Sequence, residues 1–420
     1  MALFALRAVM LLLALVGAGG ARADDVAVPV AAVVAAPVVA APAPPRGEDL
    51  VILLVTFGPG DDVTSWFGHS ALVVEDRKTQ EGRLYNYGEF GFDATTVARY
   101  ALGRLEFWVG ERPVEATFEV YRRQRRTIDA QELALSPAQR AELAAFLHNN
   151  ALPENRRYLY DHFTDNCATR PRDAVDVVAA GALAAAGAAP GRMTLRQHVR
   201  RHTDRSLVMS TLIDLVLNRS VDAPTTRAQE AFLPAELHKL VVDARVGGAS
   251  LQLRGWRDFD APARAPVPAE PPRNEPWMLA VGVVVAVVSL LLRRFTRVFA
   301  LWLAGLGLFV GLPGVVLVII WSSTDHLVAH NNENVLLANP LALLSFPLGV
   351  AWALGIERAG GWLRRVWAVV AVVVVGAVVL KALPWFGQDN WNIVALVVPL
   401  ALGTALALRR SAARPVESVS

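Results

Sequence analysis

One cysteine in the chain stands where a reactive thiol is favoured. Cys167 lies in the polar run 165–170 (DNCATR), directly before an alanine-rich segment that is typical of a helix. The unpaired backbone N–H groups and the dipole of a helix start stabilise a thiolate. The sequence has no second cysteine that could pair with it. We therefore interpret Cys167 as a nucleophile, with a small buried structural residue as the alternative.

A cysteine nucleophile needs a base for its proton and donors for the oxyanion that forms on the substrate. We predict His69 as the base, because it follows Gly68 at the start of a strand pattern. Asn86 and Glu89 are the candidates for holding the imidazole, and we favour Asn86 because it lies nearer the centre of the next strand. The backbone N–H of Cys167 supplies one oxyanion donor.

His162 is a rival base, but its aromatic neighbours are typical of structural packing. A zinc site formed by His69, His162 and Cys167 would lack the close paired spacing that structural zinc ligands usually have. We expect neither a metal nor a cofactor.

An α+β domain would position these residues. Short runs that are rich in apolar or aromatic residues predict strands at 49–57, 70–76, 83–92, 105–109 and 116–121. Ser136 and Pro137 predict the start of a helix that ends near residue 149, since serine caps a helix and proline fits its first turn. A second helix is predicted from about Cys167 to Ala180, with Pro171 near its first turn.

Composition divides the chain into segments. Residues 1–23 have the charged start, apolar core and small-residue end of a secretory signal peptide. An uncleaved anchor is the alternative. Residues 24–48 form an Ala-, Val- and Pro-rich spacer, 49–256 a globular domain, and 257–276 a second linker. The remainder is a transmembrane domain of about five helices at 277–408 and a tail at 409–420.

Five apolar stretches approach the roughly 20 residues that cross a bilayer core. They are residues 277–292, 298–321, 335–356, 366–385 and 391–408. Arginines follow the first, third and fifth stretches, which predicts cytoplasmic loops there, an outward globular domain and a cytoplasmic C-terminus. The formal net charge of +3 does not argue for nucleic acid. We expect the arginine clusters at 122–126 and 200–201 on a solvated surface, with contact to anionic headgroups as the alternative.

Four motifs occur in order at 56–60 (TFGPG), 68–71 (GHSA), 85–88 (YNYG) and 155–173 (NRRYLYDHFTDNCATRPRD). Together they resemble the Lnb-type lipoprotein N-acyltransferases over roughly residues 49 to 200. The resemblance implies a permuted papain-like fold, in which His69 and Cys167 match the catalytic pair. An Asn-rich segment at 331–340 is similar to one that follows the second span in such proteins. Position 89 departs from the family's small polar residue, which argues against a catalytic use of Glu89.

The resemblance implies that Cys167 takes an acyl chain from a phospholipid as a thioester and passes it to the N-terminal amine of a diacylglyceryl lipoprotein. The bacterial inner membrane would hold both substrates. The residues expected to support the site or bind substrate are Ser70, Tyr87, Asn155, Arg156, Asp161, Asp165, Asn166, Arg170, Asn334 and Asn339. Two alternatives stay open: a cell-wall peptide or peptidoglycan amidase of the same superfamily, and a non-catalytic envelope assembly or sensing module. Five spans exceed what a simple anchor needs, which favours the lipid substrate.

Overall fold

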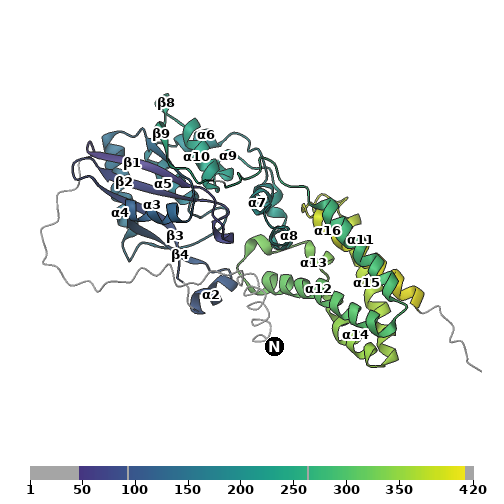
Figure 1. Cartoon of the computed structure of the whole chain (residues 1–420). Coiled ribbons are helices and arrows are strands. Elements are labelled where there is room, and N and C mark those ends of the chain that lie inside the picture. Colours follow the sequence, from purple (N-terminus) through teal and green to yellow (C-terminus); the bar gives the residue numbers. More distant parts are fainter. Residues whose placement is uncertain (1–46, 92–93, 263, 412–420) are drawn as a thin grey trace, which may run out of the picture.

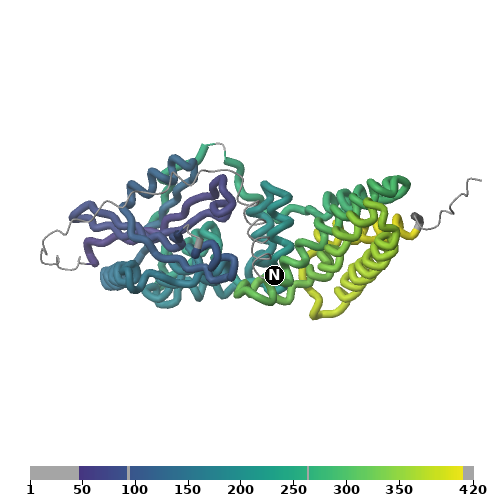
Figure 2. The backbone as a smooth tube through the Cα atoms, turned by 90° about the horizontal axis from the view of Figure 1, so that it is seen from below, coloured from purple at the N-terminus to yellow at the C-terminus, as the bar shows by residue number. Residues whose placement is uncertain are grey.

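The structure, a computed structural model, describes residues 47–91, 94–262 and 264–411. The predicted signal peptide, almost all of the spacer at 24–48 and most of the tail at 409–420 lie outside these residues. Figure 1 shows an α/β domain in purple to teal, joined to a group of long helices in green to yellow. The view at right angles in Figure 2 shows the two parts lying end to end, with a teal segment between them.

The α/β domain is built on one sheet of seven strands. Every neighbouring pair in this sheet is antiparallel. The strand order is β6 (Arg157–Leu159), β4 (Glu106–Pro113), β3 (Glu81–Glu89), β2 (His69–Asp76), β1 (Leu50–Phe57), β5 (Ile128–Leu133) and β9 (Gln252–Phe259). All eight residues of β1 are buried, because this strand is central and covered on both faces.

Helices cover both faces of the sheet (Figure 1). Ile52 and Leu54 of β1 pack in the cluster that includes residues of α4 (Pro137–Ala151), α5 (Thr169–Val178) and α10 (Pro234–Asp243). Leu53 and Val55 point the other way and pack with Phe118 of α3 (Val114–Arg123). The alternation follows from the two-residue period of a strand. Smaller elements are α2 (Ala94–Ala101), α6 (Ala182–Gly187), α7 (Leu195–Thr203), α8 (Leu207–Val216), α9 (Arg227–Glu230), η2 (Val63–Ser65), η3 (Arg219–Asp222), β7 (Arg245–Val246) and β8 (Ala249–Ser250).

The prediction of α4 is confirmed, and Ser136 with Gln139 forms a complete capping box at its start. The predicted strand at 116–121 is wrong, because this segment lies inside α3. Its β-favouring residues are overridden by packing: Phe118 is buried against the sheet, while Glu115 and Arg122 lie at the helix ends that suit their charges.

Five helical segments are long and apolar enough to cross a membrane. They are α11 (Glu275–Leu292), α12 (Thr296–Ser323), the broken segment 334–353, α15 (Glu357–Leu380) and α16 (Trp391–Ser411). The broken segment consists of α13 (Asn334–Leu337), η5 (Pro340–Leu344) and α14 (Ser345–Ala353). The fourth span begins at Glu357 rather than 366, so the arginines at 358, 364 and 365 lie within α15 and not in a loop.

A buried polar joint connects the two parts. Arg200 of α7 donates to Asp214 of α8 at 2.8 Å and to Asp389, before α16, at 2.7 Å. Arg196 binds Asp214 and Asp222, and its side chain is fully buried. The surface position expected for 200–201 is therefore wrong: both arginines are buried because carboxylates and carbonyls surround them.

Candidate active site

Three elements bring His69, Asn86 and Cys167 together. His69 begins β2, Asn86 lies in β3, and Cys167 lies in the loop two residues before α5. Gly88 shows how close two of them are: a Cβ at this position would stand 3.8 Å from Cys167 Cβ and 3.9 Å from His69 Cε1. Gly88 has φ +107°, a conformation that glycine adopts freely, and it lies at a register shift between β3 and β4.

A hydrogen bond between His69 Nε2 and Asn86 Oδ1 fixes the imidazole. The other end of the amide, Asn86 Nδ2, donates to Glu89 Oε1 at 3.4 Å. A carboxylate only accepts, so Asn86 must turn its NH₂ to Glu89 and its oxygen to His69. His69 Nε2 therefore carries the proton, and Nδ1 is left with the lone pair that a base needs.

Glu89 is the anchor of this chain of contacts. Its carboxylate accepts from Trp108 Nε1 at 3.1 Å and from Arg112 at 3.0 and 2.8 Å. All four donors surround a carboxylate that is 14% exposed. Glu89 does not touch His69 in the contacts of the described residues and acts on it only through Asn86. It is a positioning residue. A spacing of three on a regular strand would put Asn86 and Glu89 on opposite faces, and the register shift between Tyr87 and Glu89 breaks this alternation, which the spacing alone could not reveal.

The sulfur of Cys167 faces backbone donors. The backbone N–H groups of Ser70 and of Cys167 itself lie near it and act to lower its pKa. Ser70 is free to do this because the ladder between β2 and β3 begins only at Leu72 and Tyr85. These two N–H groups are suitably placed to hold negative charge on sulfur, and on an oxygen bonded next to it. The expected oxyanion donor at Cys167 thus has a second one beside it.

Burial keeps the thiol and the imidazole neutral. Burial raises the pKa of Cys167 to about 11, although the Ser70 N–H and the charge of Arg126 oppose this. Burial, with help from Arg126, lowers the pKa of His69 to about 4. The expectation that a helix start ionises the thiol is therefore not met, because desolvation outweighs the backbone N–H groups. Among the described residues, no hydrogen bond joins Cys167 to His69, so the pair is adjacent and un-ionised.

Sequence reasoning missed an aromatic and cationic layer behind the imidazole. Tyr121 of α3 stacks on Phe57 at 3.6 Å and lies parallel to His69 at 6.2 Å between ring centroids. The Arg126 guanidinium lies over Tyr121, 4.7 Å from its centroid. Arg126 is 6% exposed and donates to the Gly58 carbonyl, so it is buried and not on the expected surface. No spacing signal distinguishes it from the other arginines of 122–126.

The segment directly before Cys167, residues 161–166, builds the loop that carries it. Asp161 Oδ1 accepts from the N–H groups of residues 163 and 164. Asn166 donates to the carbonyls of His162 and Phe232 and accepts from the N–H groups of 168 and 169. Asp165 pairs with Arg170. These predicted residues shape the loop and do not contact His69.

The other predicted residues fall into two places. Near the site, Tyr87 donates to Asn150 at 2.7 Å, Asn155 donates to the carbonyl of Asn149, and Arg156 lies over Trp108. Ser70 lies beside Cys167 and has a buried hydroxyl.

Asn334 and Asn339 lie in the helical part instead. Asn334 is buried and donates to the carbonyls of Asp214 and Leu215. Asn339 caps η5 by accepting from the N–H of Leu341. Both are explained by structural hydrogen bonds, so nothing in their contacts points to substrate. His162, the rival base, packs its ring edge-on against Tyr160.

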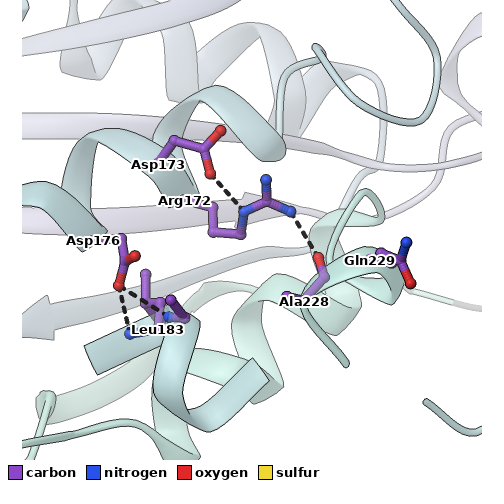
Figure 3. A pocket seen from close by; sticks show the side chains of 7 residues that line it. Arg172, Asp173, Asp176, Leu183, Ala228 and Gln229 are labelled. Atoms are coloured by element: carbon purple, nitrogen blue, oxygen red, sulfur yellow. Dashed lines mark hydrogen bonds and ion pairs between the residues drawn. The ribbon is translucent and has the colours of Figure 1, made fainter. Parts of the chain in front are cut away.

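Two hollows lie on the α5 side of the domain. Figure 3 shows a cavity of about 220 Å³, in which Arg172 points between Asp173 and the carbonyl of Ala228. Its charge is already paired, and the cavity does not reach Cys167. A larger cavity of about 410 Å³ lies between α4 and α5 and is lined in part by Tyr87, Asp165 and Arg170.

The fold and the site define a class of protein. It is a membrane protein whose α/β domain carries a cysteine–histidine site and is joined to five candidate membrane spans within the described residues. Residues 46–201 match the family described as the Lnb N-terminal periplasmic domain. Searches of curated proteins and of solved structures found no significant match. A periplasmic domain of this family, followed by five candidate spans, suggests a membrane protein of the Lnb family and fits the inner membrane.

Proposed function

We propose that this protein is a cysteine-dependent acyltransferase that moves a fatty acyl chain from a phospholipid to the N-terminal amine of a diacylglyceryl lipoprotein. The observation that carries the proposal is the contact of His69 with Asn86 beside Cys167, in a domain fixed to membrane helices. The order of a histidine on a strand and a cysteine before a later helix agrees with a permuted papain-like fold. The match to the Lnb periplasmic domain supports the same function.

The first half-reaction forms a thioester. As Cys167 Sγ attacks the ester carbonyl of the phospholipid, its proton passes to His69 Nδ1. The carbonyl oxygen becomes an oxyanion within reach of the Ser70 and Cys167 N–H groups. The C–O bond of the ester then breaks, the imidazolium returns the proton to the leaving alkoxide, and a lysophospholipid departs.

The second half-reaction forms an amide. The lipoprotein's neutral α-amine attacks the thioester carbonyl and gives a proton to His69 Nδ1. The C–S bond breaks, the proton returns to Cys167, and the acylated lipoprotein leaves. The Asn86 contact keeps Nδ1 available in both halves, because it holds the proton of the ring on Nε2.

Topology supports a site on the periplasmic side. The arginines near the start of α15 and the end of α16 are expected on the cytoplasmic side. This supports a cytoplasmic C-terminus and a Cys167 domain at the outer leaflet, where phospholipid and lipoprotein would both be present.

Replacement of Cys167 by Ser in the host tests the proposal, with His69→Ala as a second variant. His148, whose side chain is 68% exposed, provides the matched control as His148→Ala. We expect lipoproteins to lose the N-acyl group in mass spectra of the first two strains and to keep it in the control. Unchanged lipoproteins with altered muropeptides would establish an amidase instead. Full complementation with neither change would favour a non-catalytic module.

A further inference from the structure

The helix α8 buries polar side chains and exposes apolar ones, the opposite of a helix on a water-exposed surface. Ser210 and Asp214, one turn apart, are 2% and 1% exposed. Val208 is 70% exposed and Leu207 39% exposed, while Leu212 is half-buried. Leu215 packs instead against the core of the long helices. In a water-soluble protein the apolar stripe of a surface helix faces the core and the polar residues face outward.

The buried polar side has a clear function in the joint. Asp214 accepts from Arg200 at 2.8 Å and from Asn392 at 2.7 Å, and Arg196 lies against it as well. Every one of these partners comes from α7 or from the start of α16. The contacts within the protein thus explain the polar side, whereas Leu207 and Val208 on the apolar side are exposed in the described part of the chain.

The position of α8 relative to the membrane spans indicates what covers its apolar side. Asn332 and Asn334, at the outer end of the third span, donate to the carbonyls of Leu215 and Val216. Asn392, in the first turn of α16, binds Asp214. The helix therefore lies level with the outer ends of the third and fifth spans, between the two parts of the molecule (Figure 1).

The flanking residues agree with a membrane–water boundary at this level. Trp391 begins α16, and Trp385, whose carbonyl accepts from Arg219, precedes it. Tryptophan is enriched at this boundary of membrane proteins. Exposed Asp204 and Arg205 precede α8, and exposed Arg219 follows it, so charges lie at both ends and none lies on the outward stripe.

We propose that α8 lies in the outer interface of the bilayer, with Leu207, Val208 and Leu212 in lipid. An apolar helix of this length is too short to span a membrane, and interfacial helices bury such a stripe below the headgroups. The helix precedes the membrane spans in the sequence, but lipid rather than water surrounds its apolar side.

A short series of contacts connects α8 to the candidate site. The helix that precedes α8 is α7, which has His202 in its last turn. The His202 ring hydrogen-bonds to the carbonyl of Trp66 at 2.9 Å and stacks on Phe67 at 5.2 Å between ring centroids. These residues lie directly before Gly68 and His69. A lipid-embedded α8 thus fixes the height of the imidazole above the bilayer through a short, packed connection.

The unique cysteine makes a direct test simple. In the full-length Cys167→Ser protein, which has no other thiol, a single cysteine is placed at Val208 or Leu212 and given a nitroxide label. Controls are Val372 on α15, which is 72% exposed on a candidate span, and Leu253 on β9, which is 63% exposed on the sheet. The protein is studied in nanodiscs of phosphatidylethanolamine and phosphatidylglycerol by power-saturation EPR.

We expect labels at Val208 and Leu212 to have an oxygen-to-nickel-chelate accessibility ratio several-fold above that at Leu253 and close to that at Val372. Ratios equal to that at Leu253 at both positions would overturn the proposal. Because the protein lacks the Cys167 thiol, this outcome is independent of the proposed acyl transfer, and a failure of one does not imply a failure of the other.

Discussion

The contacts from Glu89 through Asn86 to His69 form a positioning chain. Replacing one carboxylate oxygen of Glu89 by an NH₂ group tests it. In Glu89→Gln, the side chain keeps its shape but gains an NH₂ end that cannot accept a hydrogen bond. Four donors now meet the carboxylate: Asn86 Nδ2, Trp108 Nε1 and two nitrogens of Arg112. Oε1 meets Asn86 and one nitrogen of Arg112, and Oε2 meets Trp108 and the other, so the new NH₂ faces arginine in either orientation. With the NH₂ in the place of Oε1, Trp108 keeps its acceptor, and Asn86 can adapt by rotating its own amide.

The rotation of the Asn86 amide would change the tautomer of the His69 imidazole. With Asn86 Nδ2 facing His69, Nε2 must accept, so the ring proton moves to Nδ1 and the base is lost. A hydrogen bond to a charged group contributes about 1.5–3 kcal/mol. The Asn86–Glu89 contact is long, at 3.4 Å, so we take the lower end of that range. Since about 1.4 kcal/mol is tenfold in rate, kcat should fall roughly tenfold with little change in KM.

The assay is acyl transfer from phospholipid to a synthetic diacylglyceryl lipopeptide by the full-length protein in nanodiscs. Glu111→Gln is the matched control, because Glu111 lies on β4 and pairs with Arg83 away from His69. In an Asn86→Ala background, Glu89→Gln should cause no further loss, since its effect passes through Asn86. Equal losses for both glutamates, or full additivity with Asn86→Ala, would refute the positioning chain.

The thiol, the glycine beside it and the buried joint each provide another prediction. Alkylation of Cys167 by iodoacetamide should accelerate about tenfold per pH unit above neutrality, because its pKa is raised to about 11, and a plateau below pH 8 would contradict this. Gly88→Ala should lower kcat, because its methyl would occupy space between Cys167 Cβ and the imidazole and its φ of +107° strains a residue with a side chain. Gly181→Ala, with φ +78° and open space around it, should share only the strain of about 1–2 kcal/mol and keep kcat. Arg196→Met should cost about 3–5 kcal/mol in the free energy of unfolding, since it leaves the nearly buried Asp222 without its cation, while Asp214 keeps Arg200. Arg104→Met breaks an exposed ion pair and should cost about 0–1 kcal/mol, so equal shifts in Tm for the two arginines would count against the joint.

Sequence pattern was most informative where local chemistry decides the structure. Ser136 and Pro137 define a helix start by local hydrogen bonding and fixed φ, and the structure begins α4 there. The preference for Asn86 over Glu89 rested on position along a strand, and Asn86 is the residue that contacts His69. The apolar stretches predicted five spans because length and hydropathy are properties of the segment itself.

Sequence pattern failed where distant residues decide the environment. Arg126 and Arg200 look like solvated arginines in the sequence, yet a stacked tyrosine buries the first and two aspartates bury the second. Asp214 and Asp389, which pair with Arg200, are 175 positions apart in the printed sequence. Likewise, nothing near Cys167 in sequence reveals that Ser70 and Gly88 enclose its thiol.

The burial that keeps Cys167 protonated also suits an outward thiol. Disulfides form readily in the periplasm, and it is the thiolate that attacks disulfides and reacts with oxidants. A resting thiol with a pKa near 11 is almost entirely protonated at neutral pH, so it resists these side reactions. In the proposed reaction, the two backbone N–H groups near the sulfur and the lone pair on His69 Nδ1 would act when an ester carbonyl arrives to share the charge. The site is therefore built so that the substrate, rather than the resting protein, stabilises the ionised nucleophile.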